Sequence, residues 1–257
     1  MPAAFLRGLT QRERTRRTNR QLGGILAFVA GAINAGGFLA VQRYTSHMTG
    51  IISAVADDLV LGHATLVIGG LAMLLAFLLG AVTTALLINW ARRQQLQGEY
   101  ALSLMVEAIL LLLFGLLGAN LKFAYEVFVP ATVLLLCYIM GLQNAIVTKI
   151  SHAEIRTTHM TGVVTDLGIE LGRLIYRNSD KSLNERHTVT ADRDKLAILA
   201  AILGLFVAGG IVGALAFRAL GFAATVPIAA VLMVLAAPPL LRDAAVAAKA
   251  AANRILK

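Results

Sequence analysis

The chain has 257 residues, of which 58% are hydrophobic and 14% are charged, and its mean hydropathy is +0.76. Soluble domains carry roughly a quarter charged residues, so this composition argues against a water-soluble globule, and the high hydrophobicity excludes a disordered chain. The single cysteine, Cys137, excludes an internal disulfide and a multi-cysteine metal site. The net charge of +9 gathers at the N-terminus and between apolar runs, which is typical of membrane flanks. We therefore expect the lipid bilayer as a partner and no nucleic acid.

Six apolar stretches are long enough to cross a bilayer, which needs about 20 residues per helix. They are residues 22–42, 64–90, 100–118, 127–147, 195–217 and 222–241. Two shorter runs, 49–62 and 160–172, carry acids, and we expect them to be re-entrant or interfacial helices. The predicted fold class is therefore all-α: a polytopic integral membrane protein with six transmembrane helices and two short helices.

The distribution of Lys and Arg favours a topology with both termini in the cytoplasm. Six spans place 20 of the 23 basic residues inside, whereas eight spans would place only 17 there. The predicted organisation has a disordered basic tail, two membrane repeats, the second with a cytoplasmic loop, and a basic C-terminal tail. The respective ranges are 1–20, 21–120, 121–242 (loop 176–194) and 243–257.

The chain contains an internal repeat. GAINA at 31–35 corresponds to GLQNA at 141–145, and TSHMTGIISAVADDL at 45–59 aligns without gaps with TTHMTGVVTDLGIEL at 157–171. Each half would contribute three spans, and because three is odd the second half must be inverted relative to the first. Inverted repeats with interrupted helices recur in transporters, where the binding site lies near the bilayer midplane between the repeats.

The GxxNA element, the paired T-x-H-M-T-G elements and the six-span hydropathy together resemble the YoaK family, over roughly residues 20–240. This family is a domain-of-unknown-function family of bacterial inner-membrane proteins. The resemblance implies an integral inner-membrane protein and brings no established substrate or activity.

The repeated polar residues predict a substrate path between the two halves. They are Asn34, His47, Thr49, Gly50, Asn144, His159, Thr161 and Gly162. Thr49 and Thr161 are expected to begin the short helices as N-caps, with a glycine beside each to admit a ligand. The alternative is structural: the two Asn side chains hydrogen-bond neighbouring helices, and the His and Thr side chains anchor a re-entrant turn.

Four acids are candidates for proton or ion coupling, namely Asp58, Glu107, Asp166 and Glu170. Eleven residues make about three helical turns, so each short helix places one imidazole and one carboxylate on a common stripe. Ion pairing with Arg43, Arg156 or Arg173 is the alternative role for the acids of the short helices. Glu107 lies in an otherwise uncharged span and must face the bundle interior, remain protonated or snorkel to the surface.

These patterns favour a secondary transporter or channel for a small polar or charged solute. The sequence lacks a P-loop, a G-x-S-x-G element and an H-E-x-x-H element, so we expect no enzyme activity, no cofactor and no metal. Two alternatives remain open: a membrane-embedded enzyme that uses the His and carboxylate sites, and an accessory protein without transport activity. A homodimer is compatible with this architecture.

Overall fold

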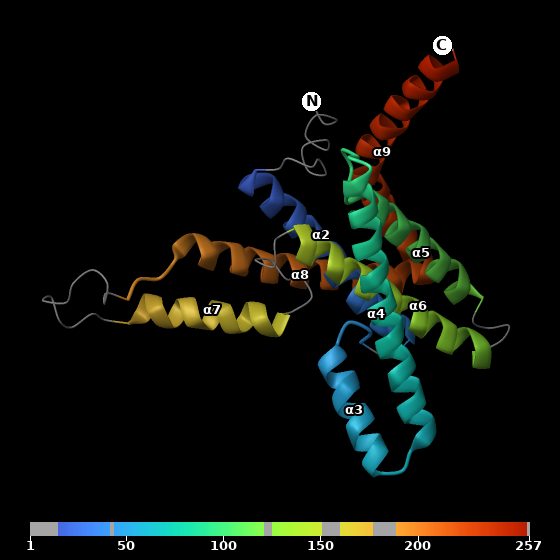
Figure 1. Cartoon of the computed structure of the whole chain (residues 1–257). Helices are drawn as coiled ribbons and strands as arrows, with labels where there is room; N and C mark the ends of the chain where they lie inside the picture. The colour runs from blue at the N-terminus through green and yellow to red at the C-terminus, as the bar shows by residue number, and fades with distance from the viewer. Residues whose placement is uncertain (1–14, 42–43, 121–124, 151–159, 177–188, 256–257) are drawn as a thin grey trace, which may run out of the picture.

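The computed structural model describes residues 15–41, 44–120, 125–150, 160–176 and 189–255. In these ranges all regular structure is helical (Figure 1). The helices are α2 (Arg16–Val41), α3 (Met48–Val60), α4 (Ala64–Arg93), α5 (Ala101–Ala119), α6 (Tyr125–Ile150), α7 (Met160–Ile175), α8 (Arg193–Leu220), the 3-10 turn η2 (Gly221–Ala224) and α9 (Thr225–Ile255).

Local capping explains several helix boundaries. The hydroxyl of Thr15 accepts a 3.2 Å hydrogen bond from the backbone N–H of Thr18 and starts α2. Residues 16–20 are therefore helical, and the prediction of a disordered tail reaching residue 20 is wrong for them. Asp192 caps α8 by accepting from the N–H of Lys195 at 3.0 Å, and Gly221 ends the helix with a φ of +57°, which suits a residue without a Cβ.

Five helical stretches of the described chain are long and apolar enough to cross a membrane. They are Arg17–Leu39, Ala64–Arg93, Ala101–Ala119, Val129–Lys149 and Arg193–Lys249. The last stretch has 57 residues and contains α8 and most of α9, joined by η2. The all-helical membrane fold is thus confirmed, while the count of six spans stays a prediction.

The helices form a central bundle from which two helical hairpins extend in different directions (Figure 1). In the bundle α2 packs along α8, α6 packs along α4, and α5 packs along α9. The short helix α3 packs mainly on α4, and α7 packs on α8. No residue of α3 is buried, so the apolar outer face of the α3–α4 hairpin is available to lipid.

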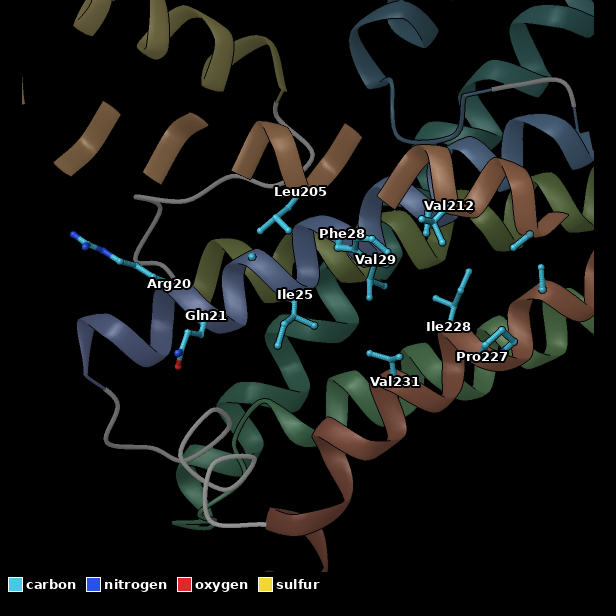
Figure 2. Close-up of a pocket in the computed structure, with 15 residues that line it drawn as sticks. Arg20, Gln21, Ile25, Phe28, Val29, Leu205, Val212, Pro227, Ile228 and Val231 are labelled. Carbon is cyan, nitrogen blue, oxygen red and sulfur yellow. The ribbon is translucent and has the colours of Figure 1, made fainter. Parts of the chain in front are cut away.

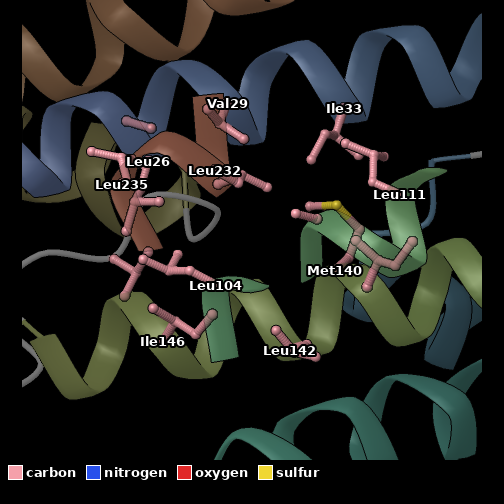
Figure 3. Packing of buried hydrophobic residues seen from close by; sticks show 14 of the residues in the cluster. Leu26, Val29, Ile33, Leu104, Leu111, Met140, Leu142, Ile146, Leu232 and Leu235 are labelled. Carbon is pink, nitrogen blue, oxygen red and sulfur yellow. The ribbon is translucent and has the colours of Figure 1, made fainter. Parts of the chain in front are cut away.

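The interior of the bundle is a continuous apolar core drawn mainly from α2, α5, α6 and α9 (Figure 3). Its largest fully buried side chains include Leu26, Ile33, Leu104, Leu111 and Met140. Because lipid tails are as apolar as leucine, close packing rather than the hydrophobic effect stabilises such a core in a membrane.

Glycines bring the backbones of the bundle into direct contact. A Cβ added to any of four glycines would collide with a carbonyl oxygen of the facing helix, so each site admits only hydrogen. The pairs of glycine and carbonyl residue are Gly31 with Phe206, Gly209 with Phe28, Gly141 with Phe77, and Gly80 with Tyr138. Along the α2–α8 contact Gly24 lies against Leu205 and Gly36 lies against Phe217, so residue numbers rise together and these two helices run parallel.

We predict that Gly209→Ala lowers the free energy of unfolding by about 1–3 kcal/mol, because the added methyl group forces two backbones apart. Thermal denaturation of the detergent-purified protein measures the change. Gly204→Ala is the matched control on the same helix, since nothing lies within 4 Å of its added Cβ, and this variant should lose no stability. Equal melting temperatures for the two variants would contradict the close-contact interpretation.

Candidate functional site

Three buried polar side chains on α5 and α6 form the candidate site, which we call the buried polar set: Ser103, Glu107 and Gln143. All three residues have 0% exposure. The Ser103 hydroxyl, both Glu107 carboxylate oxygens and both polar atoms of the Gln143 amide lack a hydrogen-bond partner in the described chain. Buried polar groups in proteins are almost always paired, so these orphaned atoms indicate a site that water, an ion or a solute completes.

The packing of α5 on α6 places Glu107 and Gln143 of the buried polar set at a similar depth of the bundle. Ser103 and Glu107 are four residues apart and share a face of α5. The hydroxyl of Tyr100 lies 3.5 Å from the carbonyl oxygen of Lys149, which aligns the two antiparallel helices. Counted from these two residues, Glu107 and Gln143 each lie about 10 Å further into the bundle, at 1.5 Å per residue.

A second polar group joins α2 to the segment before α3. The hydroxyl of Ser46 donates a 2.7 Å hydrogen bond to the Asn34 Oδ1 atom. The neighbouring Thr45 has 1% exposure, and its hydroxyl has no partner among the described residues. Asn34 therefore holds the α2–α3 connection against α2, as the structural alternative for this residue requires. Asn144, its counterpart on α6, is also half-buried.

The T-x-H-M-T-G elements differ from the prediction in their capping. The N-cap residue of α3 is His47, without a side-chain capping bond, and Thr49 lies inside the first turn. Thr49 as the N-cap is therefore wrong, and both His47 and Thr49 are exposed. Gly50 leaves room for the His47 imidazole, because a Cβ at this position would collide with the ring.

The second copy of the element begins α7 in the same register. Met160 is the first residue of α7, so Thr161 is not its N-cap either, and that expectation is also corrected. Thr161 is exposed, and Gly162 is half-buried. His159 lies outside the described residues. The sequence-predicted path residues of the short helices thus lie on the hairpins, apart from the buried polar set in the bundle.

Asp58 pairs with a histidine that the sequence analysis did not single out. Its carboxylate lies 3.0 Å from the Nδ1 atom of His63, and its carbonyl oxygen accepts the His63 N–H at 2.9 Å. The turn also contains Gly62, at a φ of +77°. Asp58 therefore closes the α3–α4 turn rather than meeting His47.

Glu170 lies in an ion-pair network between α7 and α8. Its side chain is 1% exposed and accepts from Arg173 at 2.9 Å and from the backbone N–H of Asp192 at 3.0 Å. Lys195 of α8 lies 3.7 Å from Glu170 and 3.8 Å from Asp166. The network supports the ion-pairing alternative for these two acids, because their charges are balanced by cations and by a backbone donor.

A further polar cluster fixes the α4–α5 connection and was also missed from sequence. Arg92 donates from Nε to Glu99 at 2.8 Å and from Nη2 to the Tyr100 hydroxyl at 3.1 Å. The Asp243 carboxylate of α9 accepts the backbone N–H groups of Gln97 and Gly98 at 3.1 and 3.0 Å. In the described part of the chain, no three His, Cys, Asp or Glu side chains converge on a metal site.

Comparison with known proteins places the chain among membrane proteins. The model of a family described as "Protein of unknown function (DUF1275)" matches residues 22–237. The UPF0700 transmembrane protein YoaK of Bacillus subtilis (strain 168) is 28% identical over 196 residues, which cover 75% of this chain and 81% of that protein. No solved structure matches.

We predict that Glu170→Ala releases α7 from α8, because it leaves the N–H of Asp192 and the Arg173 and Lys195 charges without their shared acceptor. Removing one partner of a buried ion pair costs about 3–5 kcal/mol. Hydrogen–deuterium exchange should therefore rise across residues 160–176. Asp166→Asn is the control, since Asp166 is half exposed and its one ion pair among the described residues is with Lys195 at 3.8 Å; unchanged exchange in Glu170→Ala would refute the assignment.

Proposed function

We propose that this chain, which belongs to the DUF1275 family, is a secondary transporter for a small polar or charged solute. The observation that carries the proposal is the buried polar set: a carboxyl group, a carboxamide and a hydroxyl group in the interior of a membrane bundle, none of which has a partner among the described residues. Ionisable residues inside membrane bundles are costly and mark ion pathways, proton relays or ligand sites.

Glu107 is the coupling residue in this proposal. No cation lies against its carboxylate among the described residues, and an ionised carboxylate in such surroundings is strongly unfavourable. A proton or a bound cation removes that cost, so the occupancy of Glu107 changes the energy of the bundle. Gln143 has donors and an acceptor at the same depth for the solute itself. No catalytic step is part of the proposal.

Equivalent contacts in the two halves support inverted repeats. Gly31 and Gly141 occupy the same position in the two GxxNA elements. Gly31 contacts the backbone of α8, the third helix of the second half, and Gly141 contacts the backbone of α4, the third helix of the first half. The last helices of the two halves, α5 and α9, pack against each other in opposite directions, since Gly98 faces Pro239 and Gly118 faces Phe222. Opposed directions of equivalent helices are what inversion requires.

Alternating access follows from this arrangement in the proposal. One half rocks against the other, and the α3–α4 and α7–α8 hairpins gate opposite faces of the membrane. Asn34 and Asn144, on the contacting helices α2 and α6, line the approach to the buried polar set. A channel would use the same groups as a static filter and would conduct without coupling.

We predict that the tips of the two hairpins lie on opposite sides of the membrane. Leu61 and Tyr176 follow α3 and α7, and both side chains are more than half exposed. In a background with Cys137→Ala, Leu61→Cys should react with a membrane-impermeant maleimide from outside intact cells, and Tyr176→Cys should react only after permeabilisation. Labelling of both positions from one side would contradict the inverted topology.

We predict that Glu107→Gln abolishes coupled transport while the protein remains folded, because a neutral amide of the same shape cannot exchange a proton or cation. Solid-supported membrane electrophysiology of reconstituted vesicles measures this. Sodium, potassium and ammonium salts, amino acids and carboxylic acids are applied one at a time, with and without a pH gradient. Wild type should give a transient current with at least one of these solutes, and the variant should give the current of protein-free vesicles.

Glu99→Gln is the matched control for this experiment. Glu99 is also a buried glutamate of the same region, but it is paired with Arg92 at 2.8 Å, so its loss should lower stability and leave coupling intact. Currents that persist unchanged in Glu107→Gln would refute the coupling role. A steady current in wild type that does not saturate with solute would favour the channel.

A further inference from the structure

An apolar cavity lies between α2, α8 and α9, on a side of the bundle that the proposed path does not use. Its volume is about 520 Å³, within the roughly 300–1,000 Å³ that is typical of ligand pockets. Figure 2 shows Ile25 and Val29 of α2 facing Ile228 and Val231 of α9 across the space. Nearly all of its lining is carbon, and it opens to the surface of the bundle.

The cavity marks a difference between the two halves. The contact between α6 and α5 is extensive, whereas the equivalent helices α2 and α9 meet at few points. Three small residues of the α2–α8 contact line the cavity, and their short side chains do not fill it: Gly24, Ala32 and Gly213. An apolar space of this kind does not hold water well, and empty space forfeits dispersion contacts. In a bilayer, the acyl chain of a lipid can occupy such a cavity.

One end of the cavity is basic. Arg20 and Gln21 line this end (Figure 2), within the first turns of α2 and close to the exposed Arg17. Arg20 is exposed and forms no ion pair with a carboxylate among the described residues. A guanidinium group binds phosphate through two parallel hydrogen bonds. Basic pockets between membrane helices bind the head groups of anionic lipids.

We propose that this cavity binds an anionic phospholipid of the bilayer, with an acyl chain between α2 and α9 and its phosphate on Arg20. The two parts of the site match the two parts of the lipid: a carbon-lined slot within the membrane and a cation where α2 enters it. The bound chain completes the α2–α9 contact that the protein leaves open. This site is separate from the buried polar set and does not depend on the transport proposal.

Native mass spectrometry of the full-length protein, titrated with phosphatidylglycerol or phosphatidylcholine of identical chains, tests the proposal. Wild type should retain phosphatidylglycerol preferentially. Arg20→Gln should weaken phosphatidylglycerol binding about tenfold, because it removes a charge-assisted hydrogen bond, and should leave phosphatidylcholine binding unchanged. Arg17→Gln, one turn earlier on the same helix but outside the cavity lining, is the control and should have little effect.

A second pair of variants tests the chain slot. Val231→Trp fills the cavity from α9 and should abolish lipid retention, whereas Val234→Trp, exposed on the same helix but outside the lining, should retain it. Both positions are exposed enough to accept the indole, and equal melting temperatures without added lipid verify the fold. Equal retention of the two lipids by wild type, or retention by Val231→Trp at the wild-type level, would overturn the proposal.

Discussion

The architecture depends on backbone-to-backbone contact between helices from different halves of the chain. In lipid the hydrophobic effect does not hold helices together, so association relies on how closely their surfaces approach. Four glycines allow carbonyl groups of the facing helix to lie directly against them. Thr84 adds a 3.0 Å hydrogen bond to the carbonyl oxygen of Leu142, and Thr83 contributes one of 2.6 Å with the Tyr138 hydroxyl. These contacts join α2 to α8 and α4 to α6.

The same contacts determine where polar chemistry is possible. The two glycine-mediated pairs leave α5 and α9 to close the bundle, and α5 carries Ser103 and Glu107 into it beside α6. Gly115 and Gly118 allow α9 and the turn before it to approach α5 closely, and no cation of the described chain pairs with Glu107. A buried acid without a counter-charge is thus a product of the packing. On the opposite side α9 does not close against α2, and the apolar cavity results.

The length of the apolar stretches predicted the helices well. Five stretches of the described chain have the length and composition of spans, and the break between residues 217 and 222 coincides with Gly221. The repeat also placed its glycines in equivalent contacts. The first residues of the helices were harder to predict, because Ser, Thr, Asp and His can all stand at the N-cap position. Thr15 caps α2 although it lies in a basic run, and the N-cap residue of α3 is His47 rather than Thr49.

The candidate site was only partly predictable for a physical reason. Glu107 could be identified from sequence, because it is an acid in an otherwise apolar span. Its burial depends on how the helices pack and could not be predicted. Ser103 is a common residue in membrane helices and has no signature of its own. The partners of Asp58 and Glu170 depend on turns and on a facing helix: His63 lies just beyond a glycine turn, and the donor to Glu170 is a backbone group 22 residues away. Sequence spacing on one helix does not contain that information.

The crossed pairing of the halves has a consequence for biogenesis. Phe28 of α2 meets Gly209 of α8, so about 180 residues separate the two sides of this contact. At roughly 5–20 residues per second of synthesis, α2 waits on the order of ten seconds or more before its partner leaves the ribosome. The α2–α8 contact can therefore form only after most of the second half has been synthesised. The bundle is complete only when the last third of the polypeptide has been inserted, so the packing of the N-terminal half depends on helices that are synthesised last.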